Sequence, residues 1–289
     1  MEFLQPATWS EALAAKAAHP DALPVAGGTD VMVELNFDRR RPPALLDLTR
    51  VAELAEWGTD GGVLRLGAGV PYRRIIDELR ERVPGLAMAA RTVGSPQIRN
   101  RGTVGGNLGS ASPAGDAHPP LLAAGALVEL ASVRGTRRVP VAGFFTGPKR
   151  SVRAPDELIA AVLLPPSAGP EQFAKVGTRN AMVIAVCSFA LALRPAQRRV
   201  GTGIGSAAPT PVRAQRAEEL LAAELPWRTR AALPDPLASR FGDLVAAAAT
   251  PIDDVRGSAS YRRHALSVLA RRTLQWAWAE HRAGDGGTP

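Results

Sequence analysis

Two short segments with paired glycines contain residue types that could bind an anion. The first is Val25-Ala26-Gly27-Gly28-Thr29-Asp30, and the second is Thr103-Val104-Gly105-Gly106-Asn107. Paired glycines place no Cβ between backbone N–H groups and a bound oxyanion, and they permit positive φ. The side chains of Thr29, Thr103 and Asn107 can add neutral hydrogen bonds. Neither segment contains Lys or Arg, so they predict a site in which mainly backbone dipoles hold a bridging diphosphate.

Each glycine pair taken singly is also typical of an ordinary tight turn. Other phosphate motifs fit poorly, because the chain has no G-x-x-x-x-G-K-[ST] motif and residues 201–206, the nearest approach to G-x-G-x-x-G, have Ser206 in sixth place. A P-loop or a Rossmann site is therefore disfavoured. Asp116, which follows the second segment, could accept hydrogen bonds from sugar hydroxyls, or it could be the acidic residue at the start of a helix.

Little else in the chain suggests a reactive centre. Cys187 is the only cysteine, which excludes an internal disulfide and a cluster held by four thiolates of this chain, so any iron–sulfur cluster would lie on another chain. The four histidines are far apart and form no metal-binding pattern, so no metal site is predicted. No activated nucleophile or proton-transferring triad is visible, and we predict no catalytic residues.

The net charge of +8, from 35 basic and 27 acidic residues, raises the question of a nucleic-acid partner. The arginines are scattered and only 5% of the residues are aromatic, so nucleic-acid binding is disfavoured. The first residues lack the basic start and apolar core of a signal peptide. The longest apolar run, residues 182–193, is shorter than the ~20 residues that span a membrane. We expect a cytoplasmic protein without a membrane span.

Helix and strand patterns surround the glycine segments. We expect a helix from an N-cap at Ser10 to Ala18, strands at 23–26, 45–48 and 63–68, and a helix with Tyr72, Ile75, Ile76 and Leu79 on one face. Residues 94–116 hold six glycines and no sustained hydrophobic period, which predicts a long irregular functional segment. A helix through Leu121 and Leu122 and strands at 127–130 and 158–164 follow.

The composition changes after a Pro-rich linker at 165–170. Beyond it we expect strands at 173–175, 183–193 and 200–204 and amphipathic helices at 213–223 and 258–278. One face of the last helix is expected to pack in a core, through Leu266, Leu269, Thr273 and Trp276. Residues 284–289 are expected to form a disordered tail.

Four motifs in order along the chain resemble one protein family. They are A-G-G-T-D at 26–30, G-S-P-Q-I-R-N-R-G-T-V-G-G-N-L at 94–108, A-S-P-A-G-D at 111–116 and D-V-R-G-S-A-S-Y-R-R at 254–263. Together they resemble the FAD-binding medium subunit of the xanthine dehydrogenase and carbon monoxide dehydrogenase family of molybdenum hydroxylases. The resemblance covers nearly the whole chain, and the order and spacing of the motifs are more specific than either glycine pair.

The resemblance implies an α+β fold with FAD between two subdomains. A vanillyl-alcohol-oxidase-like (PCMH-type) FAD-binding domain would cover 1–167, with α+β subdomains at about 1–57 and 58–167, and a small α+β domain would cover 168–283. Family members often carry an aromatic residue where Val93 stands. The implied FAD-binding residues are Val25, Ala26, Gly27, Gly28, Thr29, Asp30, Val31, Thr103, Val104, Gly105, Gly106 and Asn107 at the diphosphate and ribityl atoms, Asp116 at a hydroxyl, and Val93, Leu108, Ile159 and Lys175 around the rest of the flavin site. Lys175 would stabilise negative charge on the flavin or its phosphates.

The same resemblance implies partners and a role. A large subunit would hold the molybdenum cofactor and a small one two [2Fe-2S] clusters, and this chain would pass electrons through FAD to an acceptor such as NAD, in a heterotrimer or its dimer. The A-G-G-T-D motif and the G-D-A-H-P-P run at 115–120 resemble the xanthine dehydrogenase branch. The alternatives are a carbon monoxide or aldehyde dehydrogenase type of subunit, a self-contained flavin oxidoreductase of the same fold, and a cofactor-free structural or nucleic-acid-binding protein.

Overall fold

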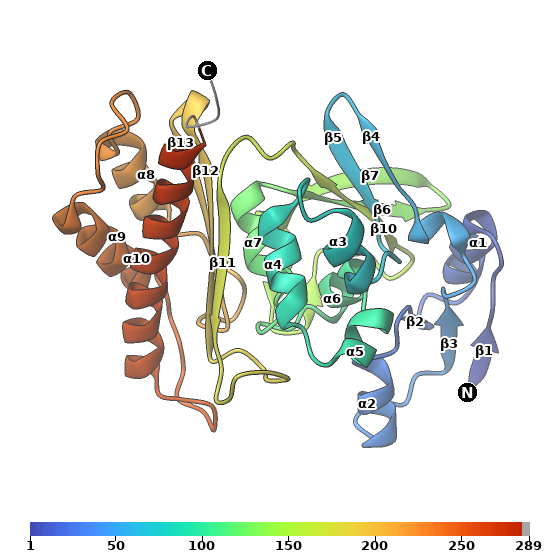
Figure 1. The fold of residues 1–289 in the computed structure, drawn as a ribbon. Coiled ribbons are helices and arrows are strands. Elements are labelled where there is room, and N and C mark those ends of the chain that lie inside the picture. The colour runs from blue at the N-terminus through green and yellow to red at the C-terminus, as the bar shows by residue number, and fades with distance from the viewer. Residues whose placement is uncertain (285–289) are drawn as a thin grey trace.

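Three main sheets and the helices between them make up the chain (Figure 1). The structure is a computed structural model that describes residues 1–284. The α+β class predicted from the sequence is confirmed. The predicted tail lies outside the described residues except for Gly284.

The first sheet is parallel, with strand order β1-β3-β2. Strands β1 (Glu2–Leu4) and β2 (Leu23–Val25) both pair with β3 (Ala44–Asp47). Helix α1 (Trp9–Ala18) lies between β1 and β2 in the sequence, and α2 (Val31–Asn36) lies between β2 and β3. The first glycine segment therefore leaves the sheet at the carboxyl end of β2, the end at which parallel sheets usually bind ligands.

The second sheet is antiparallel, with order β4-β5-β10-β6-β7. Its strands are β4 (Trp57–Asp60), β5 (Val63–Gly67), β6 (Leu127–Ser132), β7 (Gly135–Pro140) and β10 (Leu158–Leu164). The central strand, β10, is apolar and buried along its whole length, so it needs cover on both faces. The helices that follow β5 are α3 (Tyr72–Glu78), α4 (Pro84–Thr92), α5 (Pro96–Arg101), α6 (Val104–Ser110) and α7 (His118–Ala124), and a short ribbon of β8 (Phe145–Gly147) and β9 (Arg150–Ser151) precedes β10.

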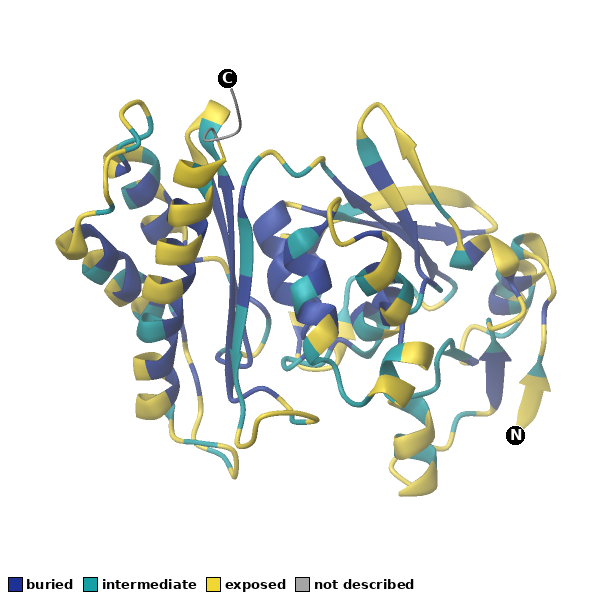
Figure 2. Cartoon of the chain, in the orientation of Figure 1, coloured by how far each residue is buried: buried dark blue, intermediate teal, exposed yellow. Residues whose placement is uncertain are grey.

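The third sheet is antiparallel, with order β11-β12-β13, and lies between two layers of helices (Figure 1). Its strands are β11 (Glu171–Val176), β12 (Cys187–Arg194) and β13 (Arg199–Gly205), and the helices after them are α8 (Gln215–Glu224), α9 (Asp235–Ala248) and α10 (Ala259–Ala283). One face packs against α8 and α10, the other against α4 and α7. Figure 2 shows this sheet buried between the two layers.

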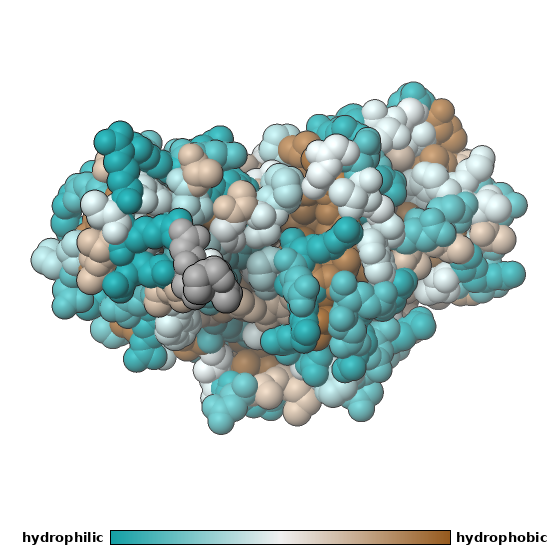
Figure 3. Space-filling view, turned by 45° about the horizontal axis from the view of Figure 1, so that its top comes forward, coloured by the Kyte–Doolittle hydropathy of each residue, from teal (hydrophilic) through white to brown (hydrophobic). Residues whose placement is uncertain are grey.

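Hydrophobic side chains form one core around the first two sheets and a second core between the third sheet and α8–α10. The face drawn in Figure 3 is mainly hydrophilic, with hydrophobic residues in small groups. Within residues 1–284, no helix is both long and apolar enough to cross a membrane.

Several predicted elements need correction. Residues 94–116 are not irregular, because they contain α5 and α6. Ser95 and Thr103 cap these helices, accepting hydrogen bonds from the N–H groups of Ile98 and Gly106. Helices of six and seven residues are too short to show a hydrophobic period. The sequence analysis also missed α4 and α9, each of which has a proline in its first turn.

The strand predicted over 183–193 begins only at Cys187. On α10, Leu266, Leu269 and Thr273 are buried as predicted, but Trp276 is 49% exposed and Trp278 is the buried tryptophan. The prediction was wrong there because the buried stripe follows i, i+4 steps through 266, 270, 274 and 278.

Helix α1 begins two residues earlier than predicted, because its N-cap is Thr8 and not Ser10. The Thr8 hydroxyl accepts from the Glu11 N–H at 3.2 Å, and the Glu11 carboxylate accepts from the Thr8 N–H at 3.3 Å. This reciprocal pair is a capping box.

We expect Thr8→Ala to lower the free energy of unfolding by about 1 kcal/mol, because a backbone donor of the first turn loses its partner. Ser10→Ala is the matched control, and we expect a change within about 0.5 kcal/mol. Urea denaturation followed by circular dichroism measures both. Equal losses in the two variants would contradict the assignment of the cap.

Candidate functional site

A cavity of about 1020 Å³ brings the two glycine segments together. Its wall contains the loop between β2 and α2, the start of α6, and parts of β10 and of the loop after β11. Figure 1 shows α2, β2 and α5 side by side in this region. The cavity is large enough for a dinucleotide-sized ligand.

The first glycine segment has free backbone donors. Residues 27–31 all line the cavity, and none of their N–H groups donates to another group of the described chain. Gly28 has φ +75°, a conformation that favours glycine. A Cβ on Gly27 would overlap the carbonyl oxygen of Arg101, so this loop lies directly on the end of α5. Five free N–H groups at the carboxyl end of a parallel strand suit an anionic ligand.

The second glycine segment differs from its prediction, because it is the first turn of α6 and not a free turn. The Gly105 N–H donates to the Ala68 carbonyl at 3.0 Å, and the Gly106 N–H donates to the Thr103 hydroxyl at 2.9 Å. Both donors are already used by the fold, since the first turn of a helix leaves N–H groups that need caps. The first segment therefore supplies most of the free backbone donors.

Two buried polar atoms in the cavity wall have no hydrogen-bond partner in the described chain. They are the Tyr72 hydroxyl oxygen and one carboxylate oxygen of Asp116, Oδ1. Tyr72 is 2% exposed, and burial raises the pKa of its phenol well above the usual value, so the hydroxyl keeps its proton. Leaving such atoms unpaired costs about 1 to 3 kcal/mol each. A ligand with one acceptor and one donor at these positions would remove that cost.

Asp116 is held by Lys175, which comes from β11 in the third sheet. The Lys175 ammonium donates to Asp116 Oδ2 at 2.6 Å and to the Thr92 carbonyl at 3.1 Å, and both charged side chains are buried. Burial raises the pKa of the Asp116 carboxyl, while the Lys175 charge acts in the opposite direction. Lys175 is thus engaged with Asp116 and does not line the cavity.

Most of the predicted site residues line this cavity. Val104 and Leu108 do not, because they form the apolar face of α6 and are fully buried in the core. Val25 and Lys175 are also absent from the wall. The predicted residues that line it are Ala26, Gly27, Gly28, Thr29, Asp30, Val31, Val93, Thr103, Gly105, Gly106, Asn107, Asp116 and Ile159.

The sequence analysis missed Tyr72 and the charged part of the wall. The sequence placed Tyr72 on the apolar face of a helix, and only the structure shows that its hydroxyl has no partner in the described chain. Six cationic side chains line the cavity against three carboxylates, and no local pattern marked them because they come from separate segments. They are Arg39, Arg40, Arg74, Arg101, Lys149 and Arg153. Among residues 1–284, no group of His, Cys, Asp and Glu has the arrangement of a metal site.

Comparison with known proteins agrees with this geometry. Residues 1–167 match the family described as FAD binding domain in molybdopterin dehydrogenase, and residues 172–277 match the CO dehydrogenase flavoprotein C-terminal domain. The chain belongs to the FAD-binding medium subunits of molybdenum hydroxylases. It is therefore an oxidoreductase component.

Individual members of this medium-subunit family are similar over nearly their whole length. The putative xanthine dehydrogenase FAD-binding subunit of Escherichia coli is 32% identical over 286 residues, 94% of each chain. The nicotine 6-hydroxylase medium subunit of Paenarthrobacter nicotinovorans is 30% identical and covers 96% of this chain and 98% of its own. A carbon monoxide dehydrogenase structure from Hydrogenophaga pseudoflava has a TM-score of 0.89 at 27% identity, covering 97% of this chain and 98% of that one.

The residues of this medium subunit fit FAD. The free N–H groups of residues 27–31 suit a diphosphate, and the unpaired atoms of Tyr72 and Asp116 suit polar edges or hydroxyls of the same ligand. Val93 and Ile159 provide apolar wall. The family assignment and the donor set thus agree.

We expect Gly27→Ala to weaken FAD binding more than tenfold, because the added methyl group forces the β2–α2 loop away from the Arg101 carbonyl. Gly58→Ala is the control, since a Cβ there meets no atom within 4 Å. Fluorescence titration with FAD measures binding, and thermal melting checks the fold. Wild-type affinity in Gly27→Ala would contradict the close approach.

His118, at the start of α7, is fully buried. Its Nε2 donates at 3.1 Å to the carbonyl of Asn107, a residue of the cavity wall. Burial lowers the pKa of His118 from 6.5 to about 4. Between these two pH values the unfolded chain binds more protons than the folded chain, so the His118 contribution falls as the pH drops from 6.5 through 4.

We therefore expect the wild type to lose about 2 kcal/mol more stability than His118→Gln between pH 7 and pH 5. His264→Gln, at an exposed histidine, should keep the wild-type pH dependence. Urea denaturation at both pH values measures the differences. The prediction fails if His118→Gln and the wild type lose stability equally.

Proposed function

We propose that this medium subunit binds one FAD in the cavity and passes electrons from an iron–sulfur partner to a soluble acceptor. The observation that supports it is the convergence of five free backbone N–H groups with two unpaired buried polar atoms in one cavity. Bound FAD supplies the electron-accepting and electron-donating chemistry. The part of the chain that we propose for this task is the FAD-binding domain over 1–167, followed by the C-terminal domain over 168–283.

The protein's own residues have separate tasks in this proposal. The N–H groups of residues 27–31 hold the diphosphate. The Tyr72 hydroxyl donates to an acceptor of the cofactor, and Asp116, held in place by Lys175, accepts from a hydroxyl. Val93 and Ile159 exclude water from the ring system. Of the residues predicted from the resemblance, Lys175 acts through Asp116, and Val104 and Leu108 act by supporting α6.

We place the protein in a complex of the xanthine dehydrogenase type, with NAD as acceptor. A small subunit with two [2Fe-2S] clusters and a large subunit with the molybdenum cofactor would complete a cytoplasmic heterotrimer or its dimer. The similarity to the xanthine dehydrogenase subunit of Escherichia coli supports this type. Relatives named for carbon monoxide, nicotine and glyceraldehyde define the competing types.

The chain has only two tyrosines, which gives a matched test of FAD binding. We expect Tyr72→Phe to weaken FAD binding about 5- to 10-fold, because one hydrogen bond to the cofactor is lost. The melting temperature without FAD should not fall, since the hydroxyl has no protein partner. Tyr261→Phe, at an exposed residue outside the cavity, should change neither quantity.

The visible absorption spectrum of the purified chain tests whether it binds a flavin. Identification of the flavin released on denaturation tests whether that flavin is FAD. Release of FAD supports the proposal. A chain that binds no FAD, alone or together with its partner subunits, would overturn it.

Acceptor and substrate need the assembled complex. We expect NADH formation with a purine as electron donor, and no NADH formation in a complex reconstituted with FAD-free medium subunit. Turnover of carbon monoxide or an aldehyde in place of a purine would assign one of the competing types. Turnover of an organic substrate by this chain alone would favour a self-contained flavin oxidoreductase.

A further inference from the structure

Arg153 is a cationic side chain in the cavity wall that makes no ion pair with the residues that the structure describes. It lies in the segment between β9 and β10 and is only partly exposed. In the part of the chain that the structure describes, it makes no hydrogen bond or ion pair, although other cavity cations such as Lys149 and Arg74 pair with Glu34 and Glu78. A partly desolvated charge without a partner is unfavourable.

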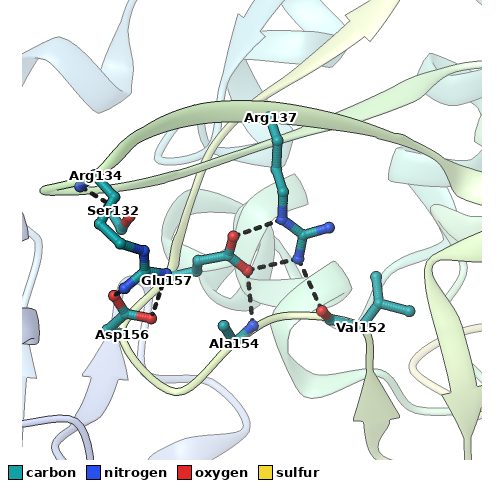
Figure 4. A network of polar contacts seen from close by, with 7 residues as sticks. All are labelled: Ser132, Arg134, Arg137, Val152, Ala154, Asp156 and Glu157. Atoms are coloured by element: carbon teal, nitrogen blue, oxygen red, sulfur yellow. Dashed lines mark hydrogen bonds and ion pairs between the residues drawn. The ribbon is translucent and has the colours of Figure 1, made fainter.

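A network of ion pairs fixes the segment on both sides of Arg153 (Figure 4). Arg137 donates to the Val152 carbonyl at 2.9 Å and to the Glu157 carboxylate at 2.6 and 2.7 Å. The same carboxylate accepts from the Ala154 N–H at 2.7 Å. The residues before and after Arg153 are thus held in place, so its position in the wall does not depend on contacts of its own side chain.

The nearby carboxylates are already used by other arginines. Glu157 pairs with Arg137, and Asp156 pairs with Arg134 (Figure 4). These pairs lower the pKa of both carboxyl groups, so both stay ionised and engaged. Arg153 therefore forms no ion pair with either carboxylate of this network.

Two other positive charges, on Arg40 and Lys16, act on Arg153 or are acted on by it. Burial and the charge of Arg40 lower the pKa of Arg153, and the charge of Glu157 acts in the opposite direction. The charge of Arg153 in turn contributes to lowering the pKa of buried Lys16 to about 8. The Lys16 ammonium donates to the carbonyls of Pro20 and Ala22 at 2.7 and 2.6 Å and makes no ion pair in the described chain. The charges of Asp21 and Asp156 raise its pKa, but burial and the charge of Arg153 outweigh them. Positive charges that raise one another's energy favour an anion in the adjoining cavity.

We propose that Arg153 binds a negatively charged group of the dinucleotide in this cavity. This inference rests on the proposed FAD site and adds a charged contact to its backbone donors. FAD offers two such groups. One is the diphosphate, which is always charged. The other is the ring after it takes up two electrons and one proton from a reductant, a change that leaves it with one additional negative charge.

The test compares Arg153→Gln with Arg150→Gln, a change to an exposed residue of the adjacent strand β9 that does not line the cavity. The first measurement is the dissociation constant of oxidised FAD for the full chain. The second is the midpoint potential of the bound flavin, measured by dithionite titration with an indicator dye. Arg153→Lys, which keeps the charge, should restore part of any effect.

The two measurements show whether Arg153 contacts the diphosphate or the reduced ring. If Arg153 meets the diphosphate, oxidised FAD should bind about tenfold more weakly in Arg153→Gln, and the potential should stay near the wild-type value. If it meets the reduced ring, binding of oxidised FAD should be unchanged while reduced FAD binds about tenfold more weakly, a fall of about 30 mV for a two-electron couple.

Wild-type affinity and potential in Arg153→Gln would overturn the inference while leaving the proposed FAD site intact. Failure of the wild type itself to bind FAD would instead overturn the proposed function. Thermal melting without FAD adds an independent check. Because the variant removes an uncompensated charge, its melting temperature should equal or exceed that of the wild type.

Discussion

Direct packing of backbone against backbone is the constraint on which this site depends. The loop after β2 touches the carbonyl end of α5, and only a residue without a Cβ fits there, at Gly27. Gly105 approaches Ala68 in the same way, with its N–H bonded to the Ala68 carbonyl. The first contact joins a loop of the first sheet to α5, and the second joins α6 to the residue that follows β5 of the second sheet. They bring both glycine segments into the wall of one cavity and leave the free N–H groups at the carboxyl end of β2.

The cavity wall contains polar groups that the described chain does not satisfy. Far from the cavity, the buried carboxylate of Glu218 is satisfied within the fold, since it accepts from Thr202 and Arg213. Inside it, Tyr72 and Asp116 keep unpaired oxygens, and cationic side chains outnumber carboxylates. Unpaired buried groups lower stability, so the folded chain gains free energy when a ligand with complementary groups binds. This arrangement favours a tightly held cofactor over a ligand that exchanges at every turnover.

The C-terminal unit contributes to the site although its own core is separate. Lys175 on β11 neutralises Asp116 and also bonds to the Thr92 carbonyl at the end of α4. Glu171 on the same strand accepts from the Gly85 N–H at the start of α4. The loop after β11 adds Met182, Val183 and Ile184 to the cavity wall. The third sheet therefore fixes the positions of α4 and Asp116.

The sequence by itself determined the α+β class, most strands, the two glycine segments and the family, because hydrophobic periods and motifs are local properties. It did not reveal α5 and α6, whose caps replace a hydrophobic period, nor the N-cap at Thr8. Tertiary structure alone decided that Lys175 pairs with Asp116 and that Arg153 makes no ion pair with residues 1–284. Ion pairing depends on residues distant in the sequence, and the desolvation that makes an unpaired charge costly exists only after the chain has folded.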